Sequence, residues 1–331
     1  MARTRVIADP VRYGFAVGRV RVLETRLLNR SHFERLLDAP SFPEQKRILS
    51  ETVYGGYLDD TETAEDVELA LARALLDVYP DFLETANLPP LMVHFFCVQH
   101  DFENLRGMLK AETVGMPVED LLNDLGSIPS ADFATGDLPA WLVPIERRVR
   151  AAIGEVDDPA RTDLIDPAVD AAMYRELNEL ALESPSVHVR NMARIGADLA
   201  NVKAFLRTRA RTMSVADATP FFVPGGEVIV DRFIAMYRLP LDEALVQLAA
   251  LPPMRGTDPE ALADPGRIDV IADKIVARRL RGALMVAIGP EPVIGYVHAR
   301  RSEVTTLRML LIGNLAGVST DLLRTRLRDV D

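Results

Sequence analysis

The chain has 331 residues, 48% of them hydrophobic, which is enough to bury a sizeable core and to form two or three structural units. With 38 basic and 49 acidic side chains its net charge is −11, which disfavours a surface that neutralises the phosphates of a nucleic acid. The single cysteine, Cys97, excludes a disulfide framework and fits a reducing compartment. Neither a signal peptide nor a membrane-spanning run of ~20 apolar residues is evident, so we expect no transmembrane segment.

The hydrophobic pattern predicts an all-α fold. Apolar residues recur at 3- and 4-residue spacings in the ranges 15–37, 65–79, 168–182, 192–209, 228–250, 269–287 and 301–312. Alternation of period 2, which is typical of strands, is scarce. Prolines and glycines interrupt the pattern often, so we expect many short helices with tight joints. The segments 126–140 and 252–267 are the most linker-like.

One ten-residue phrase occurs twice, 97 positions apart. "DFENLRGMLK" begins at Asp101 and "DLANVKAFLR" begins at Asp198. A looser third copy, "EVTTLRMLLI", begins at Glu303 and has Thr306 where the first two copies have asparagine. Such a series indicates duplication of a unit of about a hundred residues.

A second match supports this period. Phe33, Pro40 and Ile48 recur 200 positions later as phenylalanine, proline and leucine. We therefore predict three helical units that form one compact protein, with boundaries at 1–115, 116–215 and 216–331. The middle unit matches least well at its front.

Helix geometry suggests what the repeated side chains do. At about 100° per residue, Asp101 and Asn104 share a face with core-directed leucines, whereas Arg106 and Lys110 lie to its side or behind it. A buried carboxylate needs a partner, such as an arginine or the exposed N-terminus of an adjoining helix. The expected structural repeat positions are Asp101, Asn104, Arg106, Asp198, Asn201, Lys203, Glu303 and Arg308.

Reactive sites are not indicated. A duplicated catalytic carboxylate is disfavoured, because the third copy has glutamate and threonine and no nucleophile or ligand set lies nearby. Gly14 and Gly18 lack the remainder of a dinucleotide-binding motif, and the five histidines show no metal-ligand spacing. The paired aspartates needed to clamp a diphosphate through Mg²⁺, as in isoprenoid synthases, are also missing. We therefore expect no catalytic residue, cofactor, metal or direct nucleotide binding. The "VPGGEV" segment (223–228) could cradle an anion through its amides, but a turn between helices is favoured.

An ordered set of motifs resembles a known family. The motifs are "FAVGRVRVLETRLL", "LLDAPSF" with "ILSETVYGGYL", "DFENLRGMLK", "DLANVKAFLR", "VPGGEV" and the closing stretch from "PEPVIGYVHARRSEVTTLRMLLIGNL" to "LLRTRL". Together, over about residues 13–327, they resemble the C subunit of bacterial and archaeal V/A-type ATPases, a relative of the d subunit of the eukaryotic V-ATPase. Val202, Thr305 and Thr306 depart modestly from the pattern.

The resemblance implies a non-catalytic part of a rotary ATPase. Members of the family are all-α and consist of three similar units around a pseudo-threefold axis, which form a funnel-shaped socket. The resemblance implies that the D and F subunits of the rotor stalk bind in the socket, and that its base lies on the membrane proteolipid ring at the cytoplasmic face. Torque would then couple ATP synthesis or hydrolysis to proton or sodium transport. An open alternative is a soluble all-helical repeat adaptor unrelated to an ATPase, although solenoid repeats of about 35 to 47 residues are shorter than the period here.

Overall fold

All regular secondary structure in the described part of the chain is helical, which confirms the all-α prediction. The computed structural model describes residues 10–85, 87–154, 162–184, 186–264, 267–280, 282 and 285–327. Within these ranges, no helix is both long enough and apolar enough to cross a membrane. Contacts divide the chain into two compact units.

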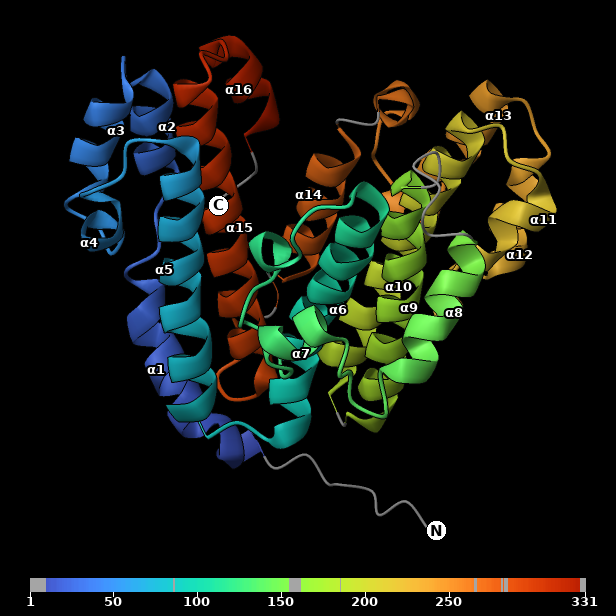
Figure 1. Ribbon diagram of the computed structural model, residues 1–331, viewed down its shortest axis with the longest axis horizontal. Coiled ribbons are helices and arrows are strands. Elements are labelled where there is room, and N and C mark those ends of the chain that lie inside the picture. The colour runs from blue at the N-terminus through green and yellow to red at the C-terminus, as the bar shows by residue number, and fades with distance from the viewer. Residues whose placement is uncertain are drawn as a thin grey trace. The chain divides into compact units, whose positions relative to one another are not determined.

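The first unit contains the described residues of Pro90–Asp269. Its three long helices are α6 (Pro90–Val114), α9 (Thr162–Glu183) and α10 (Val187–Ala210), and α9 packs against both α6 and α10 (Figure 1). Short helices follow the long ones: α7 (Ser130–Thr135), α8 (Val143–Ile153), α11 (Val215–Ala218), α12 (Val230–Tyr237) and α13 (Leu241–Ala249). Short 3-10 helices cover Glu119–Leu121, Thr219–Phe221, Pro252–Met254 and Pro259–Ala263.

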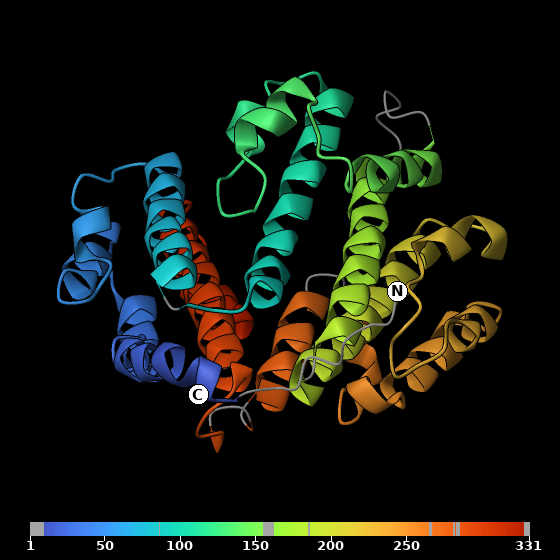
Figure 2. The same ribbon diagram turned by 90° about the horizontal axis from the view of Figure 1, so that it is seen from below.

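The second unit contains the described residues of Asp9–Pro89 and Val270–Asp331. A 3-10 helix at Pro10–Tyr13 leads into α1 (Gly14–Glu24), α2 (Arg30–Asp38), α3 (Phe42–Leu49), α4 (Gly55–Leu58) and α5 (Ala64–Thr85). From the far end of the sequence come α15 (Pro290–Leu315) and α16 (Thr320–Arg326). The long helix α15 packs against α5 and α1, and Figure 2 shows α5 alongside α15. Helix α14 (Ile268–Leu280) begins just before the division between the units.

The expectation of short helices was wrong for the elements that carry the repeated phrase. Helices α6, α10 and α15 have 25, 24 and 26 residues. Each is buried over much of its circumference, as residues 101, 102, 104 and 105 of α6 illustrate. A helix that is buried on most sides lacks a narrow apolar stripe, so its length is hard to recognise from periodicity. The division into units 1–115, 116–215 and 216–331 stays a prediction.

Two predicted helices are each interrupted. The range 15–37 forms α1 and α2, which are separated at residues 25–29, and the range 228–250 forms α12 and α13, which are separated before Leu241. Pro240 is the N-cap of α13, whereas Asn29 caps α2 by accepting a hydrogen bond of 3.2 Å from the backbone N–H of His32. The first interruption has no proline or glycine, so composition did not reveal it.

The segment 126–140, which is the most linker-like by composition, forms a loop and a short helix. It contains α7, and both Ile128 and Phe133 are buried. Its polar composition reflects a loop that is bound to α6 through hydrogen bonds. The low hydrophobicity of this segment therefore corresponds to a loop that is held firmly against α6.

We predict that Asn29→Ala lowers the free energy of unfolding by about 1 kcal/mol, because an alanine cannot accept the N–H of His32 at the start of α2. Urea denaturation of the full chain measures this change. Ser50→Ala is the control, since the Ser50 hydroxyl is exposed and donates to the carbonyl of Arg47 within the same turn. Equal stability of Asn29→Ala and the wild type would contradict the capping role.

Candidate functional site

Three buried carboxylates lie at joints between a long helix and another segment of the chain. Asp101 on α6, Asp198 on α10 and Glu303 on α15 have exposed fractions of 0%, 0% and 1%. Each accepts at least one hydrogen bond from the backbone N–H of a residue that lies just before a short helix. These are the residues that begin the three copies of the repeated phrase.

Asp101 binds the loop before α7. Its Oδ1 accepts the backbone N–H groups of Ser127 at 2.8 Å and Ile128 at 3.0 Å, and its Oδ2 accepts the Ser127 hydroxyl at 2.6 Å. One turn further along α6, the Asn104 side chain donates to the carbonyl of Asn123 at 2.7 Å and accepts the Asn123 N–H at 2.9 Å. The loop is thus held to α6 at two points.

Asp198 binds the loop before α12 in the same way. Its Oδ2 accepts the N–H of Glu227 at 2.9 Å, and its Oδ1 accepts the N–H of Val228 at 3.1 Å. Asn201 donates to the carbonyl of Val223 at 2.9 Å and accepts the Val223 N–H at 2.7 Å. The amides of the "VPGGEV" segment therefore do bind an anion, which is the chain's own Asp198 carboxylate.

Glycine is required where the loop approaches each aspartate. A Cβ atom at Gly126 would overlap Oδ1 of Asp101, and a Cβ atom at Gly226 would overlap Oδ1 of Asp198. The two glycines are 100 positions apart, and the sequence pattern alone did not identify them as equivalent. Arg26 stands at the position 100 residues before Gly126, where the acidic partner is the longer Glu303.

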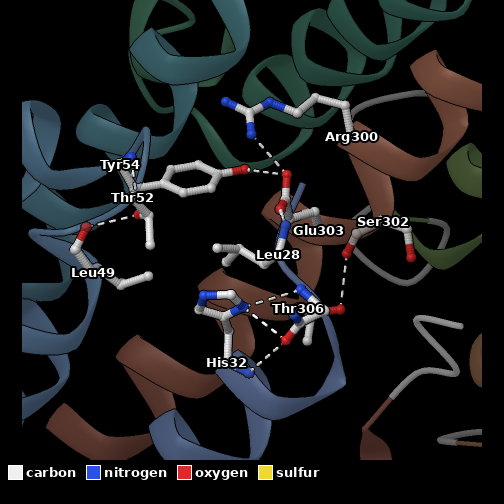
Figure 3. A network of polar contacts seen from close by, with 10 residues as sticks. Leu28, His32, Leu49, Thr52, Tyr54, Arg300, Ser302, Glu303 and Thr306 are labelled. Carbon is white, nitrogen blue, oxygen red and sulfur yellow. Dashed lines mark hydrogen bonds and ion pairs between the residues drawn. The ribbon is translucent and has the colours of Figure 1, made fainter. Parts of the chain in front are cut away.

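Glu303 has a different set of partners (Figure 3). One carboxylate oxygen accepts the backbone N–H of Leu28, and the other accepts the Tyr54 hydroxyl at 2.8 Å and the Arg300 guanidinium at 2.7 Å. The Arg300 guanidinium also lies over the Tyr54 ring, 4.4 Å from its centroid. Thr306, in the place of the asparagine, donates to the carbonyl of Ser302 in its own helix at 2.8 Å. In the other two joints an asparagine holds the loop by a second pair of hydrogen bonds. At this joint Arg300 and Tyr54 take its place.

Burial changes the titration of all three acids. Desolvation raises the pKa of Asp101 although three hydrogen bonds oppose it, and raises the pKa of Asp198 to about 6. Desolvation also raises the pKa of Glu303, against the attraction of Arg300. Burial, together with the nearby Glu303 charge, holds the pKa of Tyr54 well above its usual value. The Tyr54 hydroxyl therefore remains a donor at any physiological pH.

The three repeated cations form ion pairs with other helices. Arg106 lies 2.5 Å from Asp170 in α9 and Lys203 lies 2.5 Å from Asp269 in α14. Arg308, in the third copy, lies 2.6 Å from Glu68 in α5. Each cation thus pairs with an acidic side chain outside its own long helix.

Among the residues that the structure describes, the repeated polar side chains make anchoring contacts within the chain. The carboxylate oxygens are occupied by donors within the chain, and no described group of histidine, cysteine or acidic side chains could hold a metal ion. Burial raises the pKa of Cys97 to about 11, so its thiol stays protonated and unreactive near neutral pH. Of the histidines, His100 pairs with Glu103 at 2.7 Å and His94 lies edge-on to Trp141. These contacts account for both rings structurally.

Sequence reasoning missed the partners of the acids. Tyr54 and Arg300 lie outside the repeated phrase, and the phrase itself does not show which loop returns to it. One overlooked signal was present: Leu28, Ile128 and Val228 stand at intervals of 100, and each donates its N–H to one of the three acids.

We predict that Gly226→Ala destabilises the chain by about 1–3 kcal/mol, because the added Cβ displaces the Asp198 carboxylate from the loop amides. Gly18→Ala is the matched control, since Gly18 is inside α1 and has no atom within 4 Å of the added methyl. That control should be neutral or stabilising by about 0.5–1 kcal/mol. Urea denaturation compares the two variants, and equal effects would show that the close approach at Gly226 has no energetic consequence.

A second prediction concerns pH. Because the pKa of Asp198 is about 6 in the folded chain and lower in the unfolded chain, its protonated form favours folding below about pH 4. The stabilisation that the bound proton gives to the folded chain falls as the pH rises from about 4 to about 6, and above pH 6 it no longer changes with pH. The stability of the wild type relative to Asp198→Asn should therefore fall by about 2 to 3 kcal/mol between pH 4 and 7.

Urea midpoints at each pH measure the difference, and Asp231→Asn, which changes an exposed carboxylate in the first turn of α12, is the control. The difference between the wild type and the control should vary less over the same range. If the stability of the wild type and that of Asp198→Asn change with pH by the same amount, the pKa of Asp198 is not raised in the folded chain.

Comparison with known proteins identifies the family of the chain. Residues 16–326 match the family described as ATP synthase (C/AC39) subunit. The C subunit of the V-type ATP synthase of Thermus thermophilus is 25% identical over 316 residues, which cover 90% of this chain and 93% of the relative. The C subunit of the A-type ATP synthase of Methanosarcina mazei is 23% identical, covering 95% and 92%, and that of the V-type sodium ATPase of Enterococcus hirae is 23% identical, covering 94% and 96%. The chain therefore belongs to the ATP synthase (C/AC39) subunit family, whose members are structural rather than catalytic parts of a membrane-associated complex.

Proposed function

We propose that the chain is the central-rotor subunit of a V/A-type ATPase or ATP synthase. In this role it links the D and F stalk subunits to the membrane proteolipid ring at the cytoplasmic face and transmits torque that is coupled to proton or sodium transport. The observation that carries the proposal is the family match over residues 16–326, together with relatives named as the C subunits of V-type and A-type enzymes.

The joints support a mechanical role. A part that transmits torque must resist bending, and packed helices with satisfied internal polar groups deform little. Asp101 and Asp198 each fix a loop to a long helix by two or three hydrogen bonds, and the neighbouring asparagines add two more. We propose that the eight repeat positions named from the sequence serve this stiffness. Their polar groups are directed to other parts of the chain and not to a substrate.

The repeat also fits a socket. Three similar helical units would surround the end of a stalk if they were related by a threefold axis, and we retain this funnel as a proposal. A soluble adaptor unrelated to an ATPase is not supported, because the family match covers almost the whole chain.

We predict that the tagged chain, isolated from mildly solubilised membranes, is accompanied by the D and F stalk subunits and by the proteolipid ring, with a single copy of the chain in each complex. Quantitative mass spectrometry of the isolated material measures this composition. Membranes that lack the tag provide the control for nonspecific recovery.

Two other compositions would be informative. Recovery of the ATPase without the D and F subunits, under conditions that preserve the rest of the central stalk, would contradict the proposed attachment. Recovery of soluble proteins alone would contradict the rotor role as a whole.

A further inference from the structure

The third carboxylate joint differs from the first two in the order of its parts along the chain. Asp101 and Asp198 bind residues that follow them by 27 and 30 positions at Ile128 and Val228. Glu303 binds Leu28, which precedes it by 275 positions. The third joint therefore connects the two ends of the sequence within the second unit.

The N-terminal segment nevertheless has the features of the other two loops. Helices α2, α7 and α12 begin at Arg30, Ser130 and Val230, at intervals of 100 residues. Three residues into each helix stands a phenylalanine, and these have exposed fractions of 0%, 1% and 0%: Phe33, Phe133 and Phe233. The sequence analysis matched Phe33 with Phe233, and Phe133 is the corresponding residue between them.

The ion pairs follow the same order. The cation of α6 pairs with α9, which follows α7, and the cation of α10 pairs with α14, which follows α12. The cation of α15, Arg308, pairs with Glu68 in α5, which follows α2. The carboxylate contacts and the ion pairs thus both place the segment that runs from α2 through α5 in the copy of the repeat that begins with α15.

We propose that the repeat is circularly permuted relative to the chain, and that Glu303, Arg300 and Tyr54 form a clasp that closes the divided copy. One copy runs from α6 to α9 and the next from α10 to α14. The remaining copy starts in α15 and is completed by α2 to α5. Its boundaries therefore differ from 1–115, 116–215 and 216–331.

The additional partners at Glu303 have a physical reason. In the first two copies, 26 to 30 residues of chain keep the loop near its aspartate even when the hydrogen bonds break. In the divided copy no short connection exists, so the joint depends on noncovalent contacts alone. Glu303 accepts from a backbone amide, a tyrosine hydroxyl and a guanidinium, and Arg300 and Tyr54 are 4% and 0% exposed. A buried ion pair with several donors is lost at high cost when one partner is removed.

Other contacts secure the same two ends. Arg324 in α16 lies 2.8 Å from Asp38 in α2, and the Gln45 side chain donates to the carbonyl of Leu310 at 3.4 Å. The Arg324 pair is exposed, and exposed pairs contribute little. The Gln45 bond is long, whereas Glu303 accepts from three donors, so loss of the buried clasp should loosen residues 28–58 against α15 more than loss of either of these contacts. This consequence concerns the chain alone and is independent of its partners.

Amide hydrogen exchange of the full chain tests the clasp. In Glu303→Gln, peptides from residues 28–58 should exchange about tenfold faster or more than in the wild type, because a buried hydrogen bond to a charged group is lost. Tyr54→Phe removes only the hydroxyl and should give a smaller acceleration in the same peptides. Peptides from residues 119–153 should keep their wild-type rates in both variants.

Asp198→Asn is the matched control. It should accelerate exchange in residues 219–237 and leave residues 28–58 unchanged, because its loop belongs to the other unit. Unchanged exchange of residues 28–58 in both clasp variants would overturn the proposal, as would equal acceleration of both units. If Glu303→Gln does not fold, Tyr54→Phe alone decides between these outcomes.

Discussion

The cost of removing a carboxylate from water is the constraint on which the joints of this chain depend. An ionised acid that is fully buried must regain donors within the protein. Asp101 and Asp198 obtain them chiefly from backbone amides of another segment, and Glu303 obtains them from one such amide, a tyrosine and an arginine. The loop that supplies these amides therefore lies against the long helix that carries the acid. The chain before each of α7, α12 and α2 is thereby held in place by one acidic side chain.

The surrounding sequence follows from this requirement. Gly126 and Gly226 leave the space that the carboxylate of Asp101 or Asp198 occupies, and an asparagine one turn away holds the loop by a second pair of hydrogen bonds. Where the chain ends interrupt the pattern, Glu303 reaches further and Arg300 and Tyr54 supply the missing donors. Joints of this kind would provide the stiffness that the proposed torque-transmitting role requires.

The sequence predicted part of this arrangement. Helical periodicity was sufficient for the all-α fold, and the repeated phrase identified the acids on the core-directed face, because both signals are local. The loop partners were missed because the repeated phrase does not show which loop returns to it, although Leu28, Ile128 and Val228 stand at intervals of 100 residues. Tyr54 and Arg300 are specific to the divided copy and therefore have no counterpart to compare. The interruption between α1 and α2 was missed because it depends on the Asn29 cap and on the Leu28 amide, which is drawn to Glu303.

The most direct measurement of the central claim is the exchange of three individual amide protons, those of Leu28, Ile128 and Val228, by NMR on the wild-type chain. None of the three lies within a helix, so only the buried acids can retain them. If the carboxylates hold the joints, these protons exchange as slowly as those at the centres of α6, α10 and α15, through opening of a whole unit. Exchange as fast as that of exposed loop amides would contradict the account.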